Sequence, residues 1–215
     1  MSLLQKYNRE RVFLKKMGVL EYFSARLPKF ILERLIPGAK MPDRKHEILR
    51  DFQERFALST LIETGTYLGD TIYALQNRFK KIYSVELDPA LADAAQKRFA
   101  KARHIVIYEG DSGIILPSIL KNISEPCLFW LDAHYSEGIT ARGTIDTPVA
   151  KELEAILSHP IKNHVILIDD ARYFSGTDGY PTIDKLVSYV RERNQNYAVE
   201  TEKDIIRIYP RYAQK

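Results

Sequence analysis

The chain has 215 residues, 45% of them apolar, which suffices for one domain with a full core and an extension. Its only cysteine, Cys127, lies in an apolar run. An intrachain disulfide framework is therefore excluded, and we expect a buried thiol in a reducing, cytoplasmic protein. No run of 18 apolar residues occurs, and the first ten residues lack an apolar core. We therefore expect neither a membrane-spanning helix nor a signal peptide.

The positive charge of the chain is concentrated near its N-terminus. Residues 1–45 contain 11 Lys and Arg against 4 Asp and Glu, whereas the remainder contains 21 against 24. Apolar residues at mixed helical spacing, interrupted at Gly18 and Pro28, predict short helices over 3–36. A further helix is predicted over 44–57. Residues 1–57 are therefore predicted to form a basic helical extension that precedes the main domain.

From Ser59 onward, strand-like and helix-like segments alternate, as in parallel βαβ units. Asp88 and Pro89 predict a helix start, with Asp as the N-cap and Pro at the first position. Strands are predicted over 59–63, 81–86, 104–108, 126–131 and 164–168, helices over 69–79, 88–101, 112–121, 146–158 and 181–194, and a closing antiparallel hairpin over 197–200 and 205–209. Residues 58–215 are therefore predicted to form an α/β domain. It has a Rossmann-like, seven-stranded, mostly parallel sheet with helices on both faces.

Two glycines follow the first predicted strand. Residues 61–67 read Leu-Ile-Glu-Thr-Gly-Thr-Tyr, and a second glycine stands at position 69. Gly65 and Gly69 allow the backbone to turn tightly from strand to helix, as in nucleotide-binding α/β sheets. Glu86 ends the next strand about 20 residues later, where a carboxylate can bind ribose hydroxyls. The NAD-type G-x-G-x-x-G is absent, and the spacing alone does not name the nucleotide.

The pattern E-x-G-x-x-x-G resembles motif I of the class I S-adenosylmethionine (SAM) methyltransferases. The resemblance implies that backbone amides of this segment hold the methionine part of SAM. It also implies that Glu86, which can accept two hydrogen bonds, binds both ribose hydroxyls. Residues 109–112 read Glu-Gly-Asp-Ser and resemble the family motif in which Asp111 would meet the adenine amino group. The cofactor-binding residues implied in this way are Glu63, Thr64, Gly65, Thr66, Tyr67, Gly69, Glu86, Asp111, Ser112 and Asp132.

Carboxylates also follow the fourth and fifth predicted strands. Asp132 comes directly after 126–131, and Asp169 and Asp170 follow 164–168. The carboxyl ends of parallel strands meet at one edge of a sheet, so we expect these side chains to lie together. Such a set of hard oxygen ligands suits Mg²⁺. No cysteine cluster accompanies His134, which argues against Zn²⁺.

This carboxylate pattern resembles the metal-dependent O-methyltransferases, most nearly the macrocin O-methyltransferase type that acts on sugar hydroxyls, over roughly residues 58–210. In that branch, an Asp two residues after the first metal-binding Asp is taken as the catalytic base. His134 occupies this position here. We therefore expect His134 and Asp132 to be catalytic, with His134 as a base near neutral pH. The alternative is a histidine that only supports the metal site.

Two segments beside this site have open roles. Residues 136–147 are rich in Gly and Thr and form either a substrate lid or a connector to the next helix. The aromatic side chains of Tyr173 and Phe174 either stack on a sugar ring or cover the core. Arg172 either serves the site or only pairs with the neighbouring carboxylates.

The sequence thus predicts a SAM- and Mg²⁺-dependent O-methyltransferase acting on a hydroxyl of a saccharide or other polyhydroxylated small molecule. A metal-independent SAM methyltransferase and a SAM-binding scaffold docked through its basic arm remain alternatives. No Asn-Pro-Pro-Tyr-like segment occurs, so we do not expect nucleic acid as the substrate. Residues 1–40 either cover the active site or contact a membrane surface as an interfacial helix. A homo-oligomer is left open.

Overall fold

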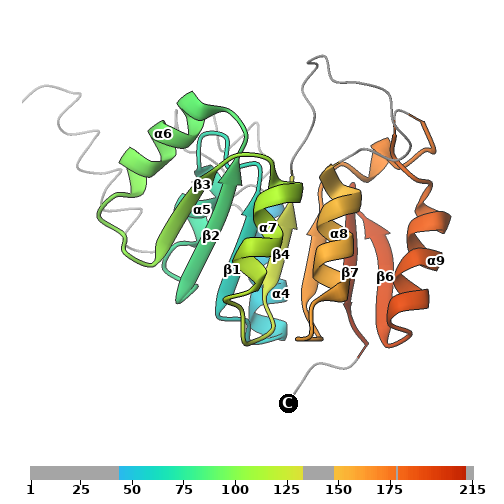
Figure 1. Cartoon of the computed structure of the whole chain (residues 1–215). Coiled ribbons are helices and arrows are strands. Elements are labelled where there is room, and N and C mark those ends of the chain that lie inside the picture. The colour runs from blue at the N-terminus through green and yellow to red at the C-terminus, as the bar shows by residue number, and fades with distance from the viewer. Residues whose placement is uncertain (1–43, 133–147, 178, 212–215) are drawn as a thin grey trace, which may run out of the picture. The chain divides into compact units, whose positions relative to one another are not determined.

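The computed structural model in Figure 1 describes residues 44–132, 148–177 and 179–211. Its elements in chain order are α4 Arg44–Arg55, β1 Thr60–Thr64, α5 Asp70–Leu75, β2 Lys81–Glu86, α6 Pro89–Phe99, β3 Ile105–Glu109, α7 Ser112–Leu120, β4 Leu128–Leu131, α8 Pro148–Ser158, β5 Val165–Ile168, the 3₁₀ turn η1 Ala171–Tyr173, α9 Ile183–Arg193, β6 Tyr197–Glu202 and β7 Ile205–Pro210. The predicted alternation of strands and helices is confirmed over these residues.

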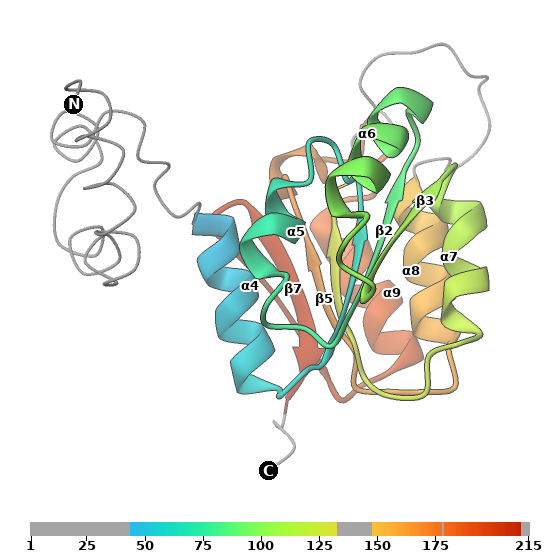
Figure 2. The same cartoon turned by 90° about the vertical axis from the view of Figure 1, so that its left-hand side faces the viewer.

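The strands form one seven-stranded sheet in the order β3-β2-β1-β4-β5-β7-β6. Strands β1 to β5 pair in parallel, whereas β7 pairs antiparallel with both β5 and β6. Residues 49–55 of α4, with α5 and α6, cover one face of the sheet, and α7, α8 and α9 cover the other (Figure 2). The predicted Rossmann-like sheet with its C-terminal antiparallel hairpin is therefore confirmed.

Several predicted boundaries need correction. The helix predicted over 69–79 ends at Leu75, because the chain must return to the sheet, where Lys80 N–H donates to Ser59 O at 2.8 Å. The strand predicted to begin at 126 begins at Leu128. Pro126 has no N–H to donate, and Cys127 N–H donates to the His164 side chain.

Two helix starts follow from side-chain caps. Asp88 accepts hydrogen bonds from the amides of Ala90 and Leu91, which confirms the predicted N-cap before Pro89. The helix predicted over 181–194 begins at Ile183, because the Thr182 side chain caps it by accepting from Lys185 N–H at 3.3 Å. Both caps join residues two or three positions apart in the chain, so the local sequence determines where these helices begin.

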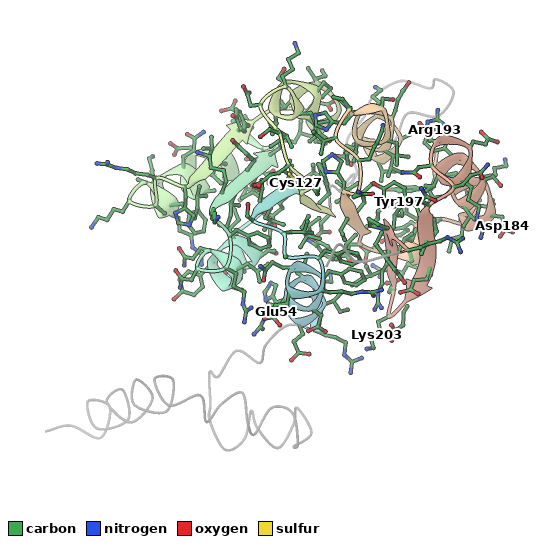
Figure 3. The ribbon with its side chains drawn as sticks, turned by 90° about the horizontal axis from the view of Figure 1, so that it is seen from below. Glu54, Cys127, Asp184, Arg193, Tyr197 and Lys203 are labelled. Atoms are coloured by element: carbon green, nitrogen blue, oxygen red, sulfur yellow. The ribbon has the colours of Figure 1, made fainter. Side chains whose placement is uncertain are left out.

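The single cysteine is buried, as predicted. Cys127 is fully buried directly before β4, and Figure 3 labels it in the interior of the sheet layer, seen from below. Burial raises the pKa of its thiol to about 12, with the Glu125 carboxylate adding to the rise. Cys127 is therefore a neutral thiol near pH 7. Among the residues that the structure describes, no helix combines the length and apolar character that crossing a bilayer requires.

Candidate active site

The carboxylates predicted at the strand ends gather at one edge of the sheet. The register pairs Thr64 at the end of β1 with Leu131 at the end of β4, and Leu131 with Ile168 at the end of β5. The backbone N–H of Asp132 donates to Thr64 O, and that of Asp169 donates to Leu131 O, each at 3.0 Å. Both hydrogen-bond ladders therefore continue one residue past the strand ends. In open α/β sheets this carboxyl edge is where ligands bind.

The loop after β1 is a tight turn fixed by its own hydrogen bonds. Gly65 N–H donates to Val85 O at 2.9 Å, and Gly69 N–H donates to Thr66 O at 2.8 Å. The backbone φ is 88° at Gly65 and 73° at Gly69, which favours glycine at both positions. The amide of Gly65 is thus engaged within the protein, and the role of this loop in holding the methionine part of SAM stays a prediction.

Helix α6 holds the same loop from outside. The Arg98 guanidinium donates to Leu68 O, and it pairs with Asp70 at 3.1 Å. A Cβ at position 69 would lie 2.7 Å from Phe99 Cε2. Gly69 therefore serves two needs at once, a left-handed backbone and a close approach to an aromatic ring.

Glu86 links two loops and still offers acceptor capacity. Its Oε2 accepts from Tyr67 N–H at 2.7 Å, and its Oε1 accepts from Asp88 N–H at 3.0 Å. The residue is 7% exposed at the end of β2. A carboxylate has about four acceptor positions, so each oxygen keeps one for a ligand hydroxyl. This geometry fits the predicted ribose anchor, whose role stays a prediction.

Glu63 is buried beneath the same loop. It is 1% exposed, and Ser84 Oγ donates to its Oε2 at 2.6 Å. Burial raises the pKa of Glu63 to about 8, and the negative charges of Asp132 and Glu86 add to the rise. Glu63 is therefore mostly protonated near neutral pH. A cation bound beside it would favour the carboxylate instead.

Asp111 is the N-cap of α7. Its Oδ1 accepts from Gly113 N–H at 2.8 Å, and its backbone is extended. The capping alternative for a carboxylate at a strand end is thus realised at this position. Contact of Asp111 or its buried neighbour Ser112 with adenine stays a prediction.

Asp132, Asp169 and Asp170 come together as predicted. One carboxylate oxygen from each lies within 4.8 Å of the others. Asp169 is buried, and its Oδ1 accepts from Asp170 N–H at 2.9 Å. A donor set of only carboxylate oxygens fits a hard divalent cation such as Mg²⁺, and the cation would offset the mutual repulsion of the three charges.

Comparison with known proteins gives consistent fold neighbours. The O-methyltransferase TomG from Streptomyces achromogenes, which is involved in tomaymycin synthesis and was solved with SAM, has a TM-score of 0.54 at 15% identity, covering 90% of this chain and 96% of TomG. An O-methyltransferase from Bacillus cereus in complex with SAH (S-adenosylhomocysteine) has a TM-score of 0.55 at 16% identity, covering 89% and 97%. The 23S rRNA methyltransferase ErmE has a TM-score of 0.51 at 17% identity, covering 79% and 68%. The chain has the class I SAM-dependent methyltransferase fold.

Sequence relatives match a shorter part of the chain than these structures do. No protein-family model matches the chain. A 53-residue segment, 25% of the chain, is 40% identical to a Methanosarcina acetivorans protein described as "Probable ribosomal RNA small subunit methyltransferase A". The matched segment spans 20% of the length of that protein. The predicted closeness to the sugar O-methyltransferase branch is therefore not established by these comparisons.

Arg172 pairs with the carboxylates of Asp170 and Asp204. This matches the predicted role in which Arg172 pairs with neighbouring carboxylates. Its Nη1 lies 2.7 Å from Asp170 Oδ1 and also contacts Asp204 Oδ2. Asp204 Oδ1 accepts from Arg172 N–H at 2.9 Å. The guanidinium offsets part of the charge of the three-carboxylate cluster of Asp132, Asp169 and Asp170. Asp204, which lies in the turn between β6 and β7, was not predicted as a neighbour of this cluster.

The aromatic residues after β5 divide between the two predicted roles. Phe174 is 5% exposed and belongs to the core, and its ring centroid is 5.3 Å from that of Tyr180. Tyr173 is 46% exposed. Phe174 therefore covers the core, and Tyr173 is the residue that remains accessible for a ligand. His134 and the predicted lid at 136–147 lie outside the described residues.

One polar residue of the region was not predicted from the sequence. Glu152 on α8 is 1% exposed, although the helix carries it among the buried residues Val149, Leu153 and Ile156. The signal was present in the sequence. Positions 149, 152, 153 and 156 have the spacing of one helical face, and an acidic residue interrupts that apolar stripe.

Proposed function

We propose that this protein is a SAM-dependent O-methyltransferase that uses Mg²⁺ to methylate a hydroxyl of a saccharide or other polyhydroxylated small molecule. The observation that carries the proposal is the convergence of Asp132, Asp169 and Asp170 within 4.8 Å. It lies at the carboxyl edge of a methyltransferase-type sheet, next to the loop that Glu86 fixes. TomG, the Bacillus cereus enzyme, ErmE and the Methanosarcina acetivorans relative all bear methyltransferase names.

Methyl transfer from SAM requires alignment more than covalent help. The sulfonium is already activated, so the protein must hold acceptor oxygen, methyl carbon and sulfur in line and exclude water. In this proposal Glu86 binds the ribose, and the loop 65–69 sets the position of the methionine part. The buried, protonated Glu63 becomes a carboxylate when the cationic cofactor binds near it.

The acceptor hydroxyl needs both a position and a base. A bound divalent cation lowers the pKa of a coordinated hydroxyl, and Asp132, Asp169 and Asp170 are the residues that would hold it. His134 is proposed as the base, because it stands two residues after Asp132 in the chain. The assignment of His134 as the proton acceptor rests on the sequence alone.

Removal of the metal tests the proposal. SAM turnover would be measured over a panel of polyhydroxylated acceptors, with and without excess chelator. We expect chelator to abolish turnover, Mg²⁺ to restore it, and SAH affinity to change little. Full turnover in excess chelator would instead establish the metal-independent methyltransferase. SAH binding with no turnover on any acceptor would favour the scaffold.

A matched pair of variants locates the metal. Asp169→Asn removes one carboxylate of the cluster, whereas Asp204→Asn neutralises a carboxylate that pairs with Arg172 outside it. We expect Mn²⁺, followed by electron paramagnetic resonance, to bind Asp169→Asn at least about tenfold more weakly than wild type, because a charged ligand is lost. Asp204→Asn should retain most of the affinity. Equal affinities in the two variants would contradict the assigned site.

Three expectations stay predictions from the sequence. They are the cytoplasmic location, the domain boundary after residue 57, and the choice for residues 1–40 between covering the active site and contacting a membrane surface. The first two do not affect the chemistry of the site. The third would be decided by vesicle sedimentation of the full chain, with SAM affinity measured in parallel.

A further inference from the structure

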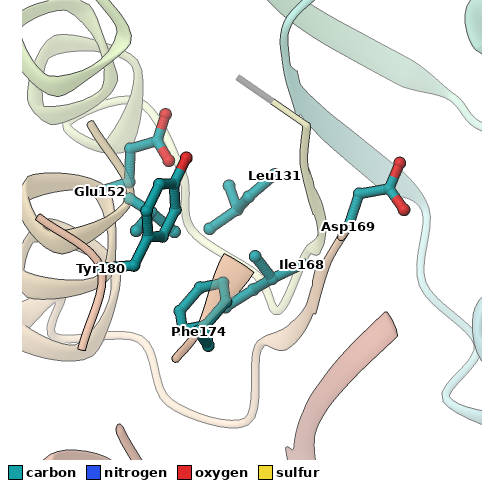
Figure 4. A pocket seen from close by; sticks show the side chains of 7 residues that line it. Leu131, Glu152, Ile168, Asp169, Phe174 and Tyr180 are labelled. Atoms are coloured by element: carbon teal, nitrogen blue, oxygen red, sulfur yellow. The ribbon is translucent and has the colours of Figure 1, made fainter. Parts of the chain in front are cut away.

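A small pocket lies between the strand ends and helix α8, on the face of the sheet that α8 covers. Its described lining residues are Leu131, Val149, Glu152, Ile168, Asp169, Phe174 and Tyr180. Figure 4 shows the Glu152 carboxylate beside the Tyr180 hydroxyl at one end, whereas the Asp169 carboxylate is turned away. Leu131 and Ile168 lie between the two carboxylates in the same view. The polar end of this pocket is therefore separate from the proposed metal site.

Glu152 and Thr64 bring buried oxygen atoms without partners to this part of the fold. Only 1% of Glu152 is exposed, and among the described residues neither of its carboxylate oxygens has a hydrogen-bond partner. Thr64, at the end of β1, is fully buried, and its Oγ1 likewise has no described partner. An unsatisfied buried polar group costs free energy. A small bound group that contacts these oxygens is therefore expected.

The charge of Glu152 favours a cation as that group. Burial raises the pKa of Glu152 to about 7, against the opposing effect of the nearby hydroxyls of Ser112 and Thr64, and the negative charge of Asp111 adds to the rise. None of the described lining residues is basic. An internal water would donate hydrogen bonds to Glu152 but leave its charge uncompensated. A cation would compensate the charge and contact the oxygens at the same time, as buried charges require.

The size of the space and the type of ligand atom limit the choice of cation. The pocket offers about 10 Å³ to the centre of a water-sized group, roughly what one water molecule needs. Mg²⁺ usually keeps several waters in its coordination shell, and this space does not hold them. The available polar atoms are carboxylate and hydroxyl oxygens, which do not suit metals that prefer sulfur or nitrogen. One carboxylate balances one positive charge, and K⁺ is a monovalent cation close to water in size.

We propose that this pocket is a structural K⁺ site in which Glu152, Thr64 and Tyr180 supply the oxygen ligands. The ion would join α8 to the end of β1 and to the segment before α9. The proposal does not depend on the proposed methyltransferase function, because none of these three residues belongs to the cluster of Asp132, Asp169 and Asp170. A ligand that binds the folded state alone stabilises it, so K⁺ should stabilise this protein.

Thallous ion tests for the site directly, because it has the charge of K⁺ and a similar size. The full-length protein in excess Mg²⁺, which competes for the carboxylate cluster, would be titrated with thallium nitrate and followed by ²⁰⁵Tl nuclear magnetic resonance. We expect a saturable signal of bound Tl⁺. Potassium nitrate should displace it, whereas choline nitrate, whose cation is too large for the pocket, should leave it in place at the same concentration.

Three variants locate the bound ion. Glu152→Gln removes the charged ligand and should weaken Tl⁺ binding at least about tenfold. Glu154→Gln removes an exposed carboxylate on the same helix and should stay within about twofold of wild type. Asp132→Asn removes a carboxylate of the cluster that does not line the pocket, and it should also bind Tl⁺ nearly as wild type.

Urea denaturation gives a second measurement that does not require a bound-ion signal. At constant ionic strength, replacing choline chloride by KCl should raise the urea midpoint of wild type up to a plateau. Glu152→Gln should show nearly the same midpoint in both salts. Each protein is compared only with itself in the two salts, so a change in the intrinsic stability of the variant does not affect the result.

Other outcomes would overturn the proposal. Absence of a displaceable Tl⁺ signal, or equal wild-type midpoints in KCl and choline chloride, would mean that the pocket holds an internal water beside a protonated Glu152. Equal Tl⁺ affinity of Glu152→Gln and wild type would mean that the ion binds elsewhere. Loss of Tl⁺ binding in Asp132→Asn but not in Glu152→Gln would assign the ion to the carboxylate cluster instead.

Discussion

His159 Nδ1 and His164 Nε2 lie 3.0 Å apart in the interior of the domain. The outer nitrogens are also engaged, because Cys127 N–H donates to His164 Nδ1 at 3.0 Å and His159 Nε2 lies 3.0 Å from Leu120 O. The chain of bonds is satisfied only if each ring carries its proton at Nε2, so both rings are neutral. The pair ties the ends of α7 and α8 to the start of β4.

Acid should therefore destabilise the protein through His164. Burial lowers the pKa of His164 to about 4, with smaller electrostatic contributions from His159 and Lys162. The unfolded chain takes up this proton near pH 6.5 and the folded protein only near pH 4, so proton uptake favours unfolding between these values. The contribution of His164 to the free energy of unfolding should be complete above pH 6.5 and fall by up to roughly 3 kcal/mol toward pH 4. The difference between wild type and His164→Gln in urea denaturation from pH 7.5 to 5 measures this contribution, because buried carboxyls such as Glu63 titrate in the opposite sense.

Two variants separate this pair from other titrating groups. His164→Gln should be less stable than wild type at pH 7.5 because the bonds are broken, and this difference should shrink as the pH falls from 6.5 to 5. His104 is half-buried, and its Nε2 lies 2.9 Å from the carbonyl oxygen of Gln76. His104→Gln should keep the wild-type pH dependence. A wild-type slope in His164→Gln would show that acid sensitivity arises elsewhere.

The fold could be predicted from local patterns, and the carboxylate cluster from topology. Strands β4 and β5 read Leu-Phe-Trp-Leu and Val-Ile-Leu-Ile and are buried at every position, and such unbroken apolar runs between helix signals indicate a parallel sheet. Once the sheet is parallel, Asp132, Asp169 and Asp170 must lie at one edge, because each follows a strand end. No knowledge of side-chain positions was needed for that step.

Features that depend on tertiary contacts could not be predicted in this way. His159 and His164 are close in the chain, yet their pairing depends on Cys127 and Leu120 from other elements. Likewise, Arg98 reaches the loop after β1 from the far end of α6. The free oxygens of Glu152 were not predictable either, since an acidic residue on an apolar stripe reveals burial but not whether partners exist.

Glu86→Ala should weaken cofactor binding. The carboxylate fixes Tyr67 N–H at 2.7 Å and keeps acceptor positions for ribose hydroxyls, and each charge-assisted bond is worth about 1.5–3 kcal/mol. Calorimetry should show SAM affinity at least about tenfold lower. Glu109 pairs with Glu86 in the register of β2 and β3 but is exposed, so Glu109→Ala is the control and should bind SAM nearly as wild type. Unchanged affinity in Glu86→Ala would exclude Glu86 as the ribose anchor.

Gly69→Ala should destabilise the protein more than Gly65→Ala. Both glycines have positive φ, 73° and 88°, and an alanine in such a conformation costs about 1 kcal/mol. At position 69 the new Cβ also meets a ring, at 2.7 Å from Phe99 Cε2. Thermal unfolding should therefore show the larger loss for Gly69→Ala, by about a further 1–3 kcal/mol from overpacking.

A relief variant tests the cause of that difference. Combining Gly69→Ala with Phe99→Leu removes the ring that the Cβ meets. The double variant should lose less stability than the two single changes added together, since the sites are in contact. Additive losses would mean that the backbone conformation alone accounts for the cost at Gly69.

Glu63→Gln should change the response of the metal-free, cofactor-free protein to base. Burial raises the pKa of Glu63 to about 8 from an ordinary value of 4.5. The unfolded chain therefore loses this proton first as the pH rises, and the contribution of Glu63 to the free energy of unfolding should fall between pH 4.5 and 8, by several kcal/mol as an order of magnitude. Gln resembles the protonated acid, so the variant should lose this dependence and exceed wild type in stability near pH 8.

Glu109→Gln, which neutralises an exposed carboxylate, should keep the wild-type dependence. Adding SAM and Mg²⁺ to wild type should reduce the fall with pH, because nearby cations favour the ionised form. Parallel wild-type and Glu63→Gln curves in denaturant titrations from pH 5 to 8.5 would mean that Glu63 ionises freely in the folded protein and does not sense a cationic ligand.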